Sequence, residues 1–216
     1  MESSVKDLRL LIVGSTGAVG QEVLRLALAD ERIQRVIAPT RRPVPAHPKL
    51  ENPVVDFSAL TGDEPWWSVD AVVCTLGTTI KIAGSQSAFA AIDRDLPIKV
   101  ARLAQGAGAT RLALNSSLGA IPSGNFYLRT KAEAEQGIRD LGYSSLTIVR
   151  PSLIDAHRTE SRLGERAGLL VAALLRPLIP RRYRPVKAES IALALLEGVL
   201  CAPPGEQIIE SEQLQD

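Results

Sequence analysis

Short apolar runs alternate with amphipathic stretches along most of the chain, and this alternation predicts strands and helices in turn. The expected strands cover residues 8–13, 33–38, 53–57, 69–76, 111–114, 146–149 and 207–209. The expected helices cover residues 21–30, 85–108, 125–141, 168–175 and 187–200, and the second of them is expected to be interrupted or bent near Pro97. The run over 69–76 is nearly all apolar, which is typical of a strand covered on both faces.

Strands that alternate with helices indicate an α/β protein with a Rossmann-like doubly wound parallel sheet flanked by helices. The 216 residues fit a single domain over 1–216. A small C-terminal helical region is expected on the substrate side, where residues from about 150 to 185 form a lid or an interface segment. The basic segment over 176–184 within it is either a site for an anionic partner or a solvated patch.

Three glycines follow the first expected strand directly, with the spacing GxxGxxG. Glycine accepts the positive φ of a tight turn and lets backbone N–H groups approach a pyrophosphate at a helix N-terminus. The spacing differs from the standard GxGxxG, but the motif lies between a strand and a helix as that fingerprint requires. Seven residues are therefore expected to bind the cofactor phosphates, with a glycine turn that binds nothing as the alternative: Gly14, Ser15, Thr16, Gly17, Ala18, Val19 and Gly20.

The end of the second expected strand lacks the acidic residue that holds the ribose 2′-hydroxyl in NAD sites. Thr40, Arg41 and Arg42 stand there instead. A guanidinium matches a 2′-phosphate in charge and hydrogen-bond geometry, so the sequence favours NADP(H) over NAD(H). A solvated arginine pair in a surface loop is the alternative.

Two further strand ends are expected to contact the cofactor. Asp56 and Phe57 end the third expected strand and are placed near the adenine ring, with a cap of the following turn as the alternative for Asp56. The fourth strand ends at the topological switch point of a doubly wound sheet, where ligands bind. Four residues at and after the end of this strand are therefore expected to contact the cofactor: Leu76, Gly77, Thr78 and Thr79. An ordinary strand-to-helix turn is the alternative.

The candidate catalytic residues follow the fifth expected strand. Tyr127 and Lys131 form a YxxxK spacing, which puts their side chains one turn apart on the same helix face. A nearby ammonium favours the phenolate form of a tyrosine, which can then protonate a carbonyl oxygen or deprotonate an alcohol. Ser116 and Ser117 end the preceding strand, where a hydroxyl can orient the substrate oxygen. A half-exposed helical pair and turn-capping serines are the alternatives.

Composition limits the expected partners, the state of the cysteines and the cellular location. The 25 basic and 24 acidic residues give a net charge of +1, so no global field favours nucleic acid or an acidic membrane. Cys74 and Cys201 lie in apolar elements and match no metal-ligand spacing, so buried reduced thiols and no metal site are expected. The chain shows neither an apolar leader nor a membrane-length apolar run, and we therefore expect a cytoplasmic protein.

Five motifs together resemble the short-chain dehydrogenase/reductase superfamily: GSTGAVG, CTLGTT, the Asn-Ser-Ser strand end, YLRTK and VRPSLI. They are most similar to its atypical branch around the Tat-interactive-protein oxidoreductase. Residues 155–165 resemble the Arg-x-Glu-Ser-Arg-x-Gly-Glu stretch of that branch. The resemblance extends over most of the chain.

This resemblance implies an NADP(H) cofactor and a set of roles for named residues. Tyr127 would be the acid/base, Lys131 would bind the nicotinamide ribose, and Pro151 would lie behind the nicotinamide. Ser117 or Ser116 would position the substrate oxygen, and the choice stays open because the serine-to-tyrosine spacing is shorter than in typical members.

The sequence thus predicts an NADP-dependent oxidoreductase that acts on a small carbonyl or alcohol. Two alternatives use the same residues: an NADP(H)-binding regulatory or sensor protein with little turnover, and an epimerase or dehydratase with a tightly held cofactor. The expected partner is a small-molecule substrate, and a homodimer is open because the superfamily often pairs through helices. No nucleic acid and no membrane span are expected.

Overall fold

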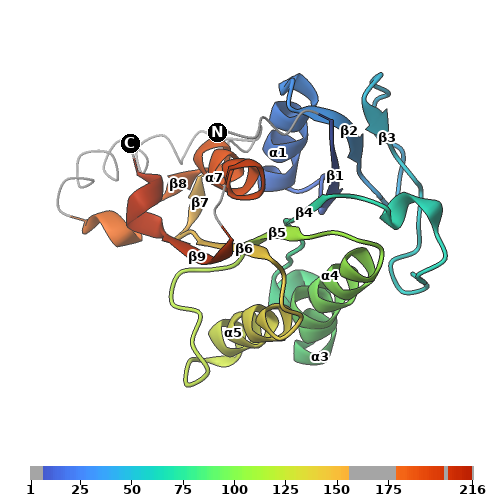
Figure 1. Ribbon diagram of the computed structural model, residues 1–216. Coiled ribbons are helices and arrows are strands. Elements are labelled where there is room, and N and C mark those ends of the chain that lie inside the picture. Colours follow the sequence, from blue (N-terminus) through green and yellow to red (C-terminus); the bar gives the residue numbers. More distant parts are fainter. Residues whose placement is uncertain (1–6, 156–178, 202–203, 216) are drawn as a thin grey trace, which may run out of the picture.

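The computed structural model describes residues 7–155, 179–201 and 204–215. Its main sheet has seven strands, all parallel, in the order β3-β2-β1-β4-β5-β6-β9 (Figure 1). The strands are β1 (Leu8–Val13), β2 (Ile33–Ile37), β3 (Leu50–Glu51), β4 (Ala71–Cys74), β5 (Arg111–Asn115), β6 (Ser145–Arg150) and β9 (Gly205–Glu210). The predicted doubly wound parallel sheet is confirmed. A separate pair consists of β7 (Ile154–Asp155) and β8 (Val186–Lys187).

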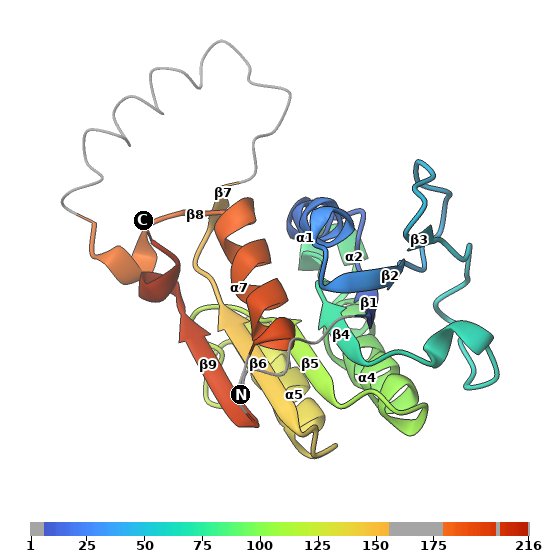
Figure 2. The ribbon, with the colours of Figure 1, turned by 45° about the horizontal axis from the view of Figure 1, so that its top comes forward.

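Helices cover both faces of the sheet (Figures 1 and 2). On one face α1 (Ala18–Ala29) packs beside α7 (Ala188–Leu200). The other face carries α3 (Gln86–Ala90), α4 (Leu96–Gly106) and α5 (Phe126–Arg139). The short α2 (Ile80–Ala83) follows β4, and 3₁₀ turns cover Pro65–Trp67, Arg181–Tyr183 and Ser211–Leu214.

The central strand β1 shows why the sequence folds into these layers. Leu10 and Ile12 point into the core beneath α1 and α7, whereas Leu11 and Val13 point into the core beneath α4 and α5. All four side chains are fully buried. Alternate residues of a strand face opposite sides, so a strand covered on both sides reads as a continuous apolar run.

The chain reverses its direction of growth across the sheet at β1. It runs outward from β1 to β2 and β3, then returns to place β4 on the other side of β1. The backbone N–H and the hydroxyl of Thr75 both donate to the Val13 carbonyl, each at 2.9 Å, and join the carboxyl ends of the two strands. This edge is the topological switch point, where open α/β sheets bind ligands.

The expected strand over residues 53–57 is wrong. The third strand is β3, at Leu50–Glu51, and Val54 forms only an isolated bridge with Thr40. The Asp56 carboxylate accepts hydrogen bonds from the Ser58 N–H at 2.9 Å and the Ser58 hydroxyl at 2.7 Å. This side-chain turn ends the extended backbone before a longer ladder can form.

The expected helix over 85–108 divides into α3, a π-helical turn at Ala91–Asp95, and α4. The expected interruption near Pro97 is therefore confirmed, and its cause is local. Proline has no N–H, and its ring clashes with the carbonyl four residues earlier, which here belongs to Asp93. The first helix begins at Ala18 rather than residue 21, because the glycine motif itself enters it. The expected apolar helix over 168–175 lies outside the described residues.

The two cysteines differ in environment. Cys74 is buried in β4, and this burial raises the pKa of its thiol to about 11. Cys201 is exposed, so the expectation that it is buried is wrong. It directly follows the last residue of α7, where the apolar face of the helix has ended.

Candidate functional site

The glycine loop between β1 and α1 is shaped by two positions that exclude a side chain. Gly14 has φ +85°, and a Cβ there would lie 2.6 Å from the carbonyl carbon of Thr75. A Cβ on Gly20 would collide with the carbonyl oxygen of Gly14. These two glycines let β1, α1 and the end of β4 meet closely at the switch point.

The exposed part of this loop fits a pyrophosphate. Residues 16–18 are exposed, whereas Ser15, Val19 and Gly20 are buried. Gly17 is the N-cap of α1 and supplies no capping side chain, so the first N–H groups of the helix remain open to an anion. The Ser15 hydroxyl is buried without a hydrogen-bond partner in the part of the chain that is described. A phosphate oxygen would satisfy such donors.

The arginine pair lies beside the glycine loop. Thr16, Arg41 and Arg42 line a cavity of about 410 Å³. Both arginines are exposed, and Thr40 before them is buried with its hydroxyl donating to the Arg42 carbonyl at 2.6 Å. The structure thus brings the predicted phosphate loop and the predicted 2′-phosphate residues to one cavity.

Asn52 holds the arginine loop from the neighbouring segment. Its amide nitrogen donates to the Ala38 carbonyl at 2.5 Å and to the Thr40 hydroxyl at 2.9 Å. Its amide oxygen accepts from the Val44 N–H at 3.0 Å. Both ends of one side chain therefore fix the backbone on either side of Arg41 and Arg42.

The end of β4 carries a buried ion pair that the sequence did not indicate. The Lys131 ammonium lies 2.7 Å from the Asp93 carboxylate, and the two side chains are 8% and 0% exposed. The second carboxylate oxygen of Asp93 accepts from the Thr78 N–H at 2.9 Å. A Cβ on Gly77 would lie 3.7 Å from the Lys131 Nζ, so this exposed glycine stands directly over the pair.

Helix α5 presents three polar residues at intervals of four: Tyr127, Lys131 and Glu135. Asn125 caps the helix by accepting from the Leu128 N–H at 3.0 Å, which places Tyr127 in the first turn. Tyr127 is half-buried, and its ring lies 5.5 Å from that of Phe89, centroid to centroid. The spacing predicted from YxxxK is therefore realised on one helix face.

The two candidate serines have different surroundings. Ser116 is buried, and its hydroxyl donates to Glu135 at 2.5 Å. Glu135 also accepts two hydrogen bonds from Arg150, at 3.0 and 2.6 Å, and these bonds raise the pKa of Arg150. Ser117 is only half-buried. Ser116 is thus held in a buried polar network, whereas Ser117 is partly exposed.

The other predicted cofactor residues lie along the same edge in varied roles. Thr79 caps α2 by accepting from the Ile82 N–H at 3.2 Å. Asp56 is engaged in its own turn with Ser58, and these hydrogen bonds lower its pKa. Leu76 and Phe57 are half-buried against the core beneath α4 and α5. Pro151 is buried, and its carbonyl accepts from the Leu118 N–H at 2.8 Å.

Sequence reasoning missed Asp93, Glu135 and Asn52. Glu135 continues the four-residue interval from Tyr127 and Lys131, a usable signal. Asp93 precedes Pro97 by four residues, which marks a helix defect but says nothing about a lysine partner. Asn52 has no such sequence signal.

The described residues contain neither a candidate metal site nor a candidate membrane span. Among residues 7–155, 179–201 and 204–215, no group of three or more His, Cys, Asp or Glu side chains could hold a metal ion. Across the same residues, no helix has both the length and the apolar character needed to cross a membrane.

A glycine turn that opens a helix at the switch point of a parallel sheet defines the class of NAD(P)-binding Rossmann proteins. The chain matches the model of the NAD(P)H-binding family over residues 14–172, and it belongs to that family as an atypical short-chain dehydrogenase/reductase. This confirms the resemblance seen in the sequence motifs.

Two relatives and one solved structure illustrate the match. The chain is 34% identical over 162 residues to the protein HTATIP2 of Rattus norvegicus. This aligned region covers 72% of this chain and 66% of HTATIP2. It is 32% identical over 173 residues to the mitochondrial protein fmp52 of Emericella nidulans, or 76% of this chain and 74% of that one. The solved structure of MoeE5 in complex with UDP-glucose and NAD matches this chain with a TM-score of 0.70 at 15% sequence identity. The match covers 95% of this chain and 79% of MoeE5. At that identity the likeness concerns the fold.

The relatives correct one expectation. Proteins of the same name from Coccidioides immitis, Meyerozyma guilliermondii and Lodderomyces elongisporus are also called mitochondrial. The expectation of a cytoplasmic protein is therefore wrong on this comparison. It rested on the lack of an apolar leader, which is the mark of secretion and does not report on other compartments.

Proposed function

We propose that this protein is an NADP(H)-dependent oxidoreductase of the short-chain type that acts on a small carbonyl or alcohol. The observation that carries the proposal is the position of Lys131. Its ammonium is buried at the carboxyl end of β4, one helical turn from Tyr127 and beside the switch point. A phenol and an ammonium at a dinucleotide site form the acid/base set that hydride transfer to a carbonyl requires.

Three side chains share the tasks of the proposed reaction. The nicotinamide supplies or accepts the hydride when bound. The Tyr127 phenol donates a proton to the carbonyl oxygen during reduction and accepts it from the alcohol during oxidation. The Lys131 ammonium stabilises the phenolate and binds the nicotinamide ribose, and the Ser117 hydroxyl orients the substrate oxygen.

The preference for NADP(H) is supported by the cavity of Thr16, Arg41 and Arg42. Two guanidinium groups beside the pyrophosphate loop suit a 2′-phosphate. The acids nearby have other partners, because Glu51 pairs with Arg35 at 3.0 Å and Asp56 accepts from Ser58. Glu51 lies beside Ile37, the last residue of β2, and its ion pair with Arg35 competes with the ribose hydroxyl that an NAD site holds there.

The proposal is tested by following NADPH absorbance against a panel of aldehydes, ketones and keto sugars. We expect turnover with at least one compound, and Tyr127→Phe should lower kcat by about 10²- to 10⁴-fold because the proton donor is lost. The NADPH Kd should change little. Tyr143→Phe is the matched control, since this tyrosine precedes the amino end of β6, on the opposite side of the sheet from the carboxyl-end site, and should keep full activity.

Two outcomes would contradict the proposal in different ways. NADPH binding without turnover of any compound would support the regulatory alternative. Conversion of a sugar into its epimer without net consumption of NADPH would support the epimerase alternative.

A further inference from the structure

Exposed apolar side chains gather at the carboxyl edge of the sheet, where β4, β5 and β6 end. Exposed apolar residues that stand singly are common on any protein surface, whereas a group of them marks a site of contact. Nine large apolar residues of the described chain are exposed, and five of them lie in the segments that follow these three strands: Ile80, Ile82, Ile121, Leu153 and Ile154. Such a concentration beside the proposed reaction site points to a ligand.

The three segments start from neighbouring positions. β4, β5 and β6 are adjacent parallel strands, so their carboxyl ends share one edge of the sheet. The Leu118 N–H donates to the Pro151 carbonyl at 2.8 Å and joins the segment after β5 to the segment after β6. Neighbouring strands lie about 4.8 Å apart, so the three strand ends span about 10 Å, the size of a small molecule.

Ile121 lies close to the proposed acid/base. A Cβ on Gly124 would lie 3.2 Å from the Cγ2 of Ile121 and 2.8 Å from the Cβ of Leu128. Ile121 is therefore beside the first turn of α5, the turn that carries Tyr127. Its side chain is nevertheless 49% exposed, so part of its apolar surface remains open next to the site.

The short helix α2 presents apolar surface that core packing does not explain. It buries none of its four residues, and Ile82 is 79% exposed. Most helices in proteins are stabilised by packing of an apolar face. The ends of α2 are capped instead, because Thr79 accepts from the Ile82 N–H at 3.2 Å and the Gly84 N–H donates to the Ile80 carbonyl at 3.0 Å. Its isoleucines are thus open to a ligand at the end of β4.

The same segments are poor in charge. Residues 75–85, 116–125 and 151–155 contain two charged side chains, Lys81 and Asp155, whereas 23% of the whole chain is charged. A phosphorylated substrate is usually held by several cationic side chains. The three segments therefore favour an uncharged substrate.

We propose that the substrate is an apolar carbonyl compound whose aliphatic or aromatic body lies on Ile82, Ile121 and Leu153, an inference that rests on the proposed function. Covering these side chains removes apolar surface from water and so favours binding. The reacting group lies at Tyr127: the carbonyl carbon accepts the hydride of NADPH, the carbonyl oxygen accepts the phenol proton, and an alcohol results.

The test follows NADPH oxidation with two homologous series, the unbranched aldehydes from propanal to nonanal and the ketones from acetone to 2-nonanone. Glyceraldehyde and dihydroxyacetone are the hydroxylated matches of propanal and acetone. We expect kcat/KM to rise about two- to four-fold with each added methylene until the apolar surface is covered. The hydroxylated compounds should react more slowly than their matches.

Two variants connect this length dependence to the apolar side chains. Ile82→Gln and Ile121→Gln should each lower kcat/KM for the longest substrate about five-fold or more, and leave kcat/KM for the shortest substrate and the NADPH Kd unchanged. Both positions are exposed, so the variants should fold as the wild type does. Leu193→Gln is the matched control, since Leu193 is 46% exposed in the middle of α7, and it should keep the full length dependence.

The possible failures are distinguishable. Rates that do not depend on chain length, or that are higher for the hydroxylated compounds, would overturn this inference and leave the proposed function standing. A length dependence that both glutamine variants retain in full would do the same. No turnover of any compound would overturn the proposed function together with this inference.

Discussion

Residues along one face of α5 differ in their exposure and in the groups they contact. Lys131 and Glu135 are each almost fully buried, and each faces an oppositely charged side chain. Tyr127, in the first turn, is half-buried, and its ring lies tilted against that of Phe89. Along this face, α5 therefore runs from a partly exposed tyrosine to a fully buried carboxylate within about two turns.

The two serines at the end of β5 should separate under mutation. We expect Ser117→Ala to lower kcat by about 10²-fold, because a hydrogen bond to the substrate oxygen is lost, with little change in stability. Ser116→Ala should instead lower the free energy of unfolding by about 1 kcal/mol, because Glu135 loses a buried donor. Initial rates and urea unfolding would measure the two effects. The reverse pattern would show that Ser116 is the substrate serine.

At the scale of residues, the sequence indicated which side chains belong to the candidate site better than it indicated the residues they contact. The YxxxK spacing predicted which side chains share a helix face, since four residues make about one turn. It left Ser116 and Ser117 equivalent, because the difference between them is Glu135, nineteen positions away in the chain. A contact across elements has no local signature.

At the scale of elements, the loop that follows β2 is held in shape by side-chain hydrogen bonds. The backbone from Ala38 to Val44 is held by the side-chain amide of Asn52, and Thr40 closes it from inside. Exposed arginines lose side-chain entropy when they bind an anion, and a fixed backbone reduces that cost. If the loop binds the proposed 2′-phosphate, its fixed backbone is therefore expected to add to the effect of its charge.

This loop is expected to determine the choice of dinucleotide. Arg41→Ala/Arg42→Ala should weaken NADPH by about 10- to 100-fold and leave NADH nearly unchanged, because only NADPH carries the 2′-phosphate. Asn52→Ala should shift the ratio of the two Kd values in the same direction while both arginines remain. Titration by protein fluorescence quenching would measure the Kd values of NADPH and NADH for the wild type and both variants. Equal affinities for NADPH and NADH in the wild type would contradict the phosphate site.

Element boundaries could be predicted where apolar patterns were long and failed where a side chain or a proline intervened. β1, β4 and α5 follow their patterns closely. The strand near residue 55 was lost to the turn of Asp56, and the helix after Ser85 was divided by Pro97. In both cases a local hydrogen bond or steric clash overrode the apolar pattern.

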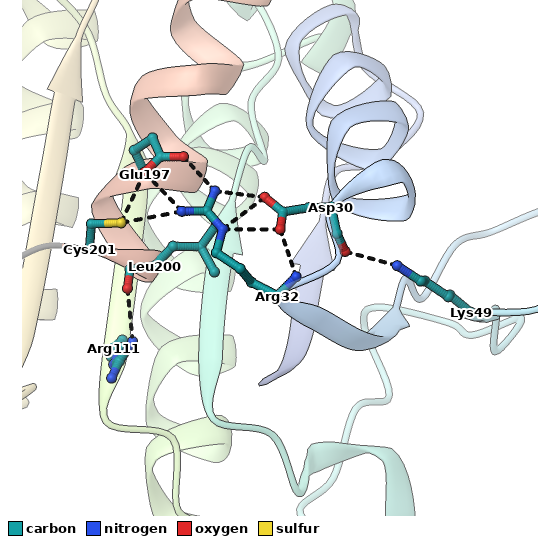
Figure 3. Close-up of polar contacts among 7 residues, drawn as sticks. All are labelled: Asp30, Arg32, Lys49, Arg111, Glu197, Leu200 and Cys201. Atoms are coloured by element: carbon teal, nitrogen blue, oxygen red, sulfur yellow. Dashed lines mark hydrogen bonds and ion pairs between the residues drawn. The ribbon is translucent and has the colours of Figure 1, made fainter. Parts of the chain in front are cut away.

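At the scale of the whole molecule, an ion network joins the α1–β2 turn to the end of α7. Arg32 lies 2.7 Å from Asp30 and 2.6 Å from Glu197, and Glu197 also accepts from the Cys201 thiol (Figure 3). Arg111 donates to the carbonyls of Val199 and Leu200, which closes the same helix end. The network fixes α7 across the sheet from α5.

The network predicts a pH dependence of stability. Hydrogen bonds from Arg32 lower the pKa of Asp30 and of Glu197 below their ordinary values of 3.8 and 4.5. Lowered carboxyl pKa values stabilise the folded state above these values, and the contribution is lost as the pH falls through the folded pKa values. Arg32→Gln should therefore cost about 1 kcal/mol at neutral pH, and this cost should shrink as the pH falls through the lowered pKa values of Asp30 and Glu197.

Urea unfolding at a series of pH values would measure this difference. Arg102→Gln, at an exposed position of α4, is the control and should show no pH-dependent change. A cost for Arg32→Gln that stays constant into acid would show that the residue stabilises by packing of its stem alone.

The parallel sheet also sets the order in which the chain can fold. β9 pairs with β6 over six residues whose partners lie about 60 positions apart, and β1 and β4 are separated by a similar distance. Such non-local pairing makes folding slow, because loop closure comes before the contacts that reward it. During synthesis the outer edge of β6 stays unpaired until residue 210 has left the ribosome. The growing chain therefore exposes a strand edge that a chaperone can bind, or a second chain can pair with, while the proposed catalytic helix has already been made.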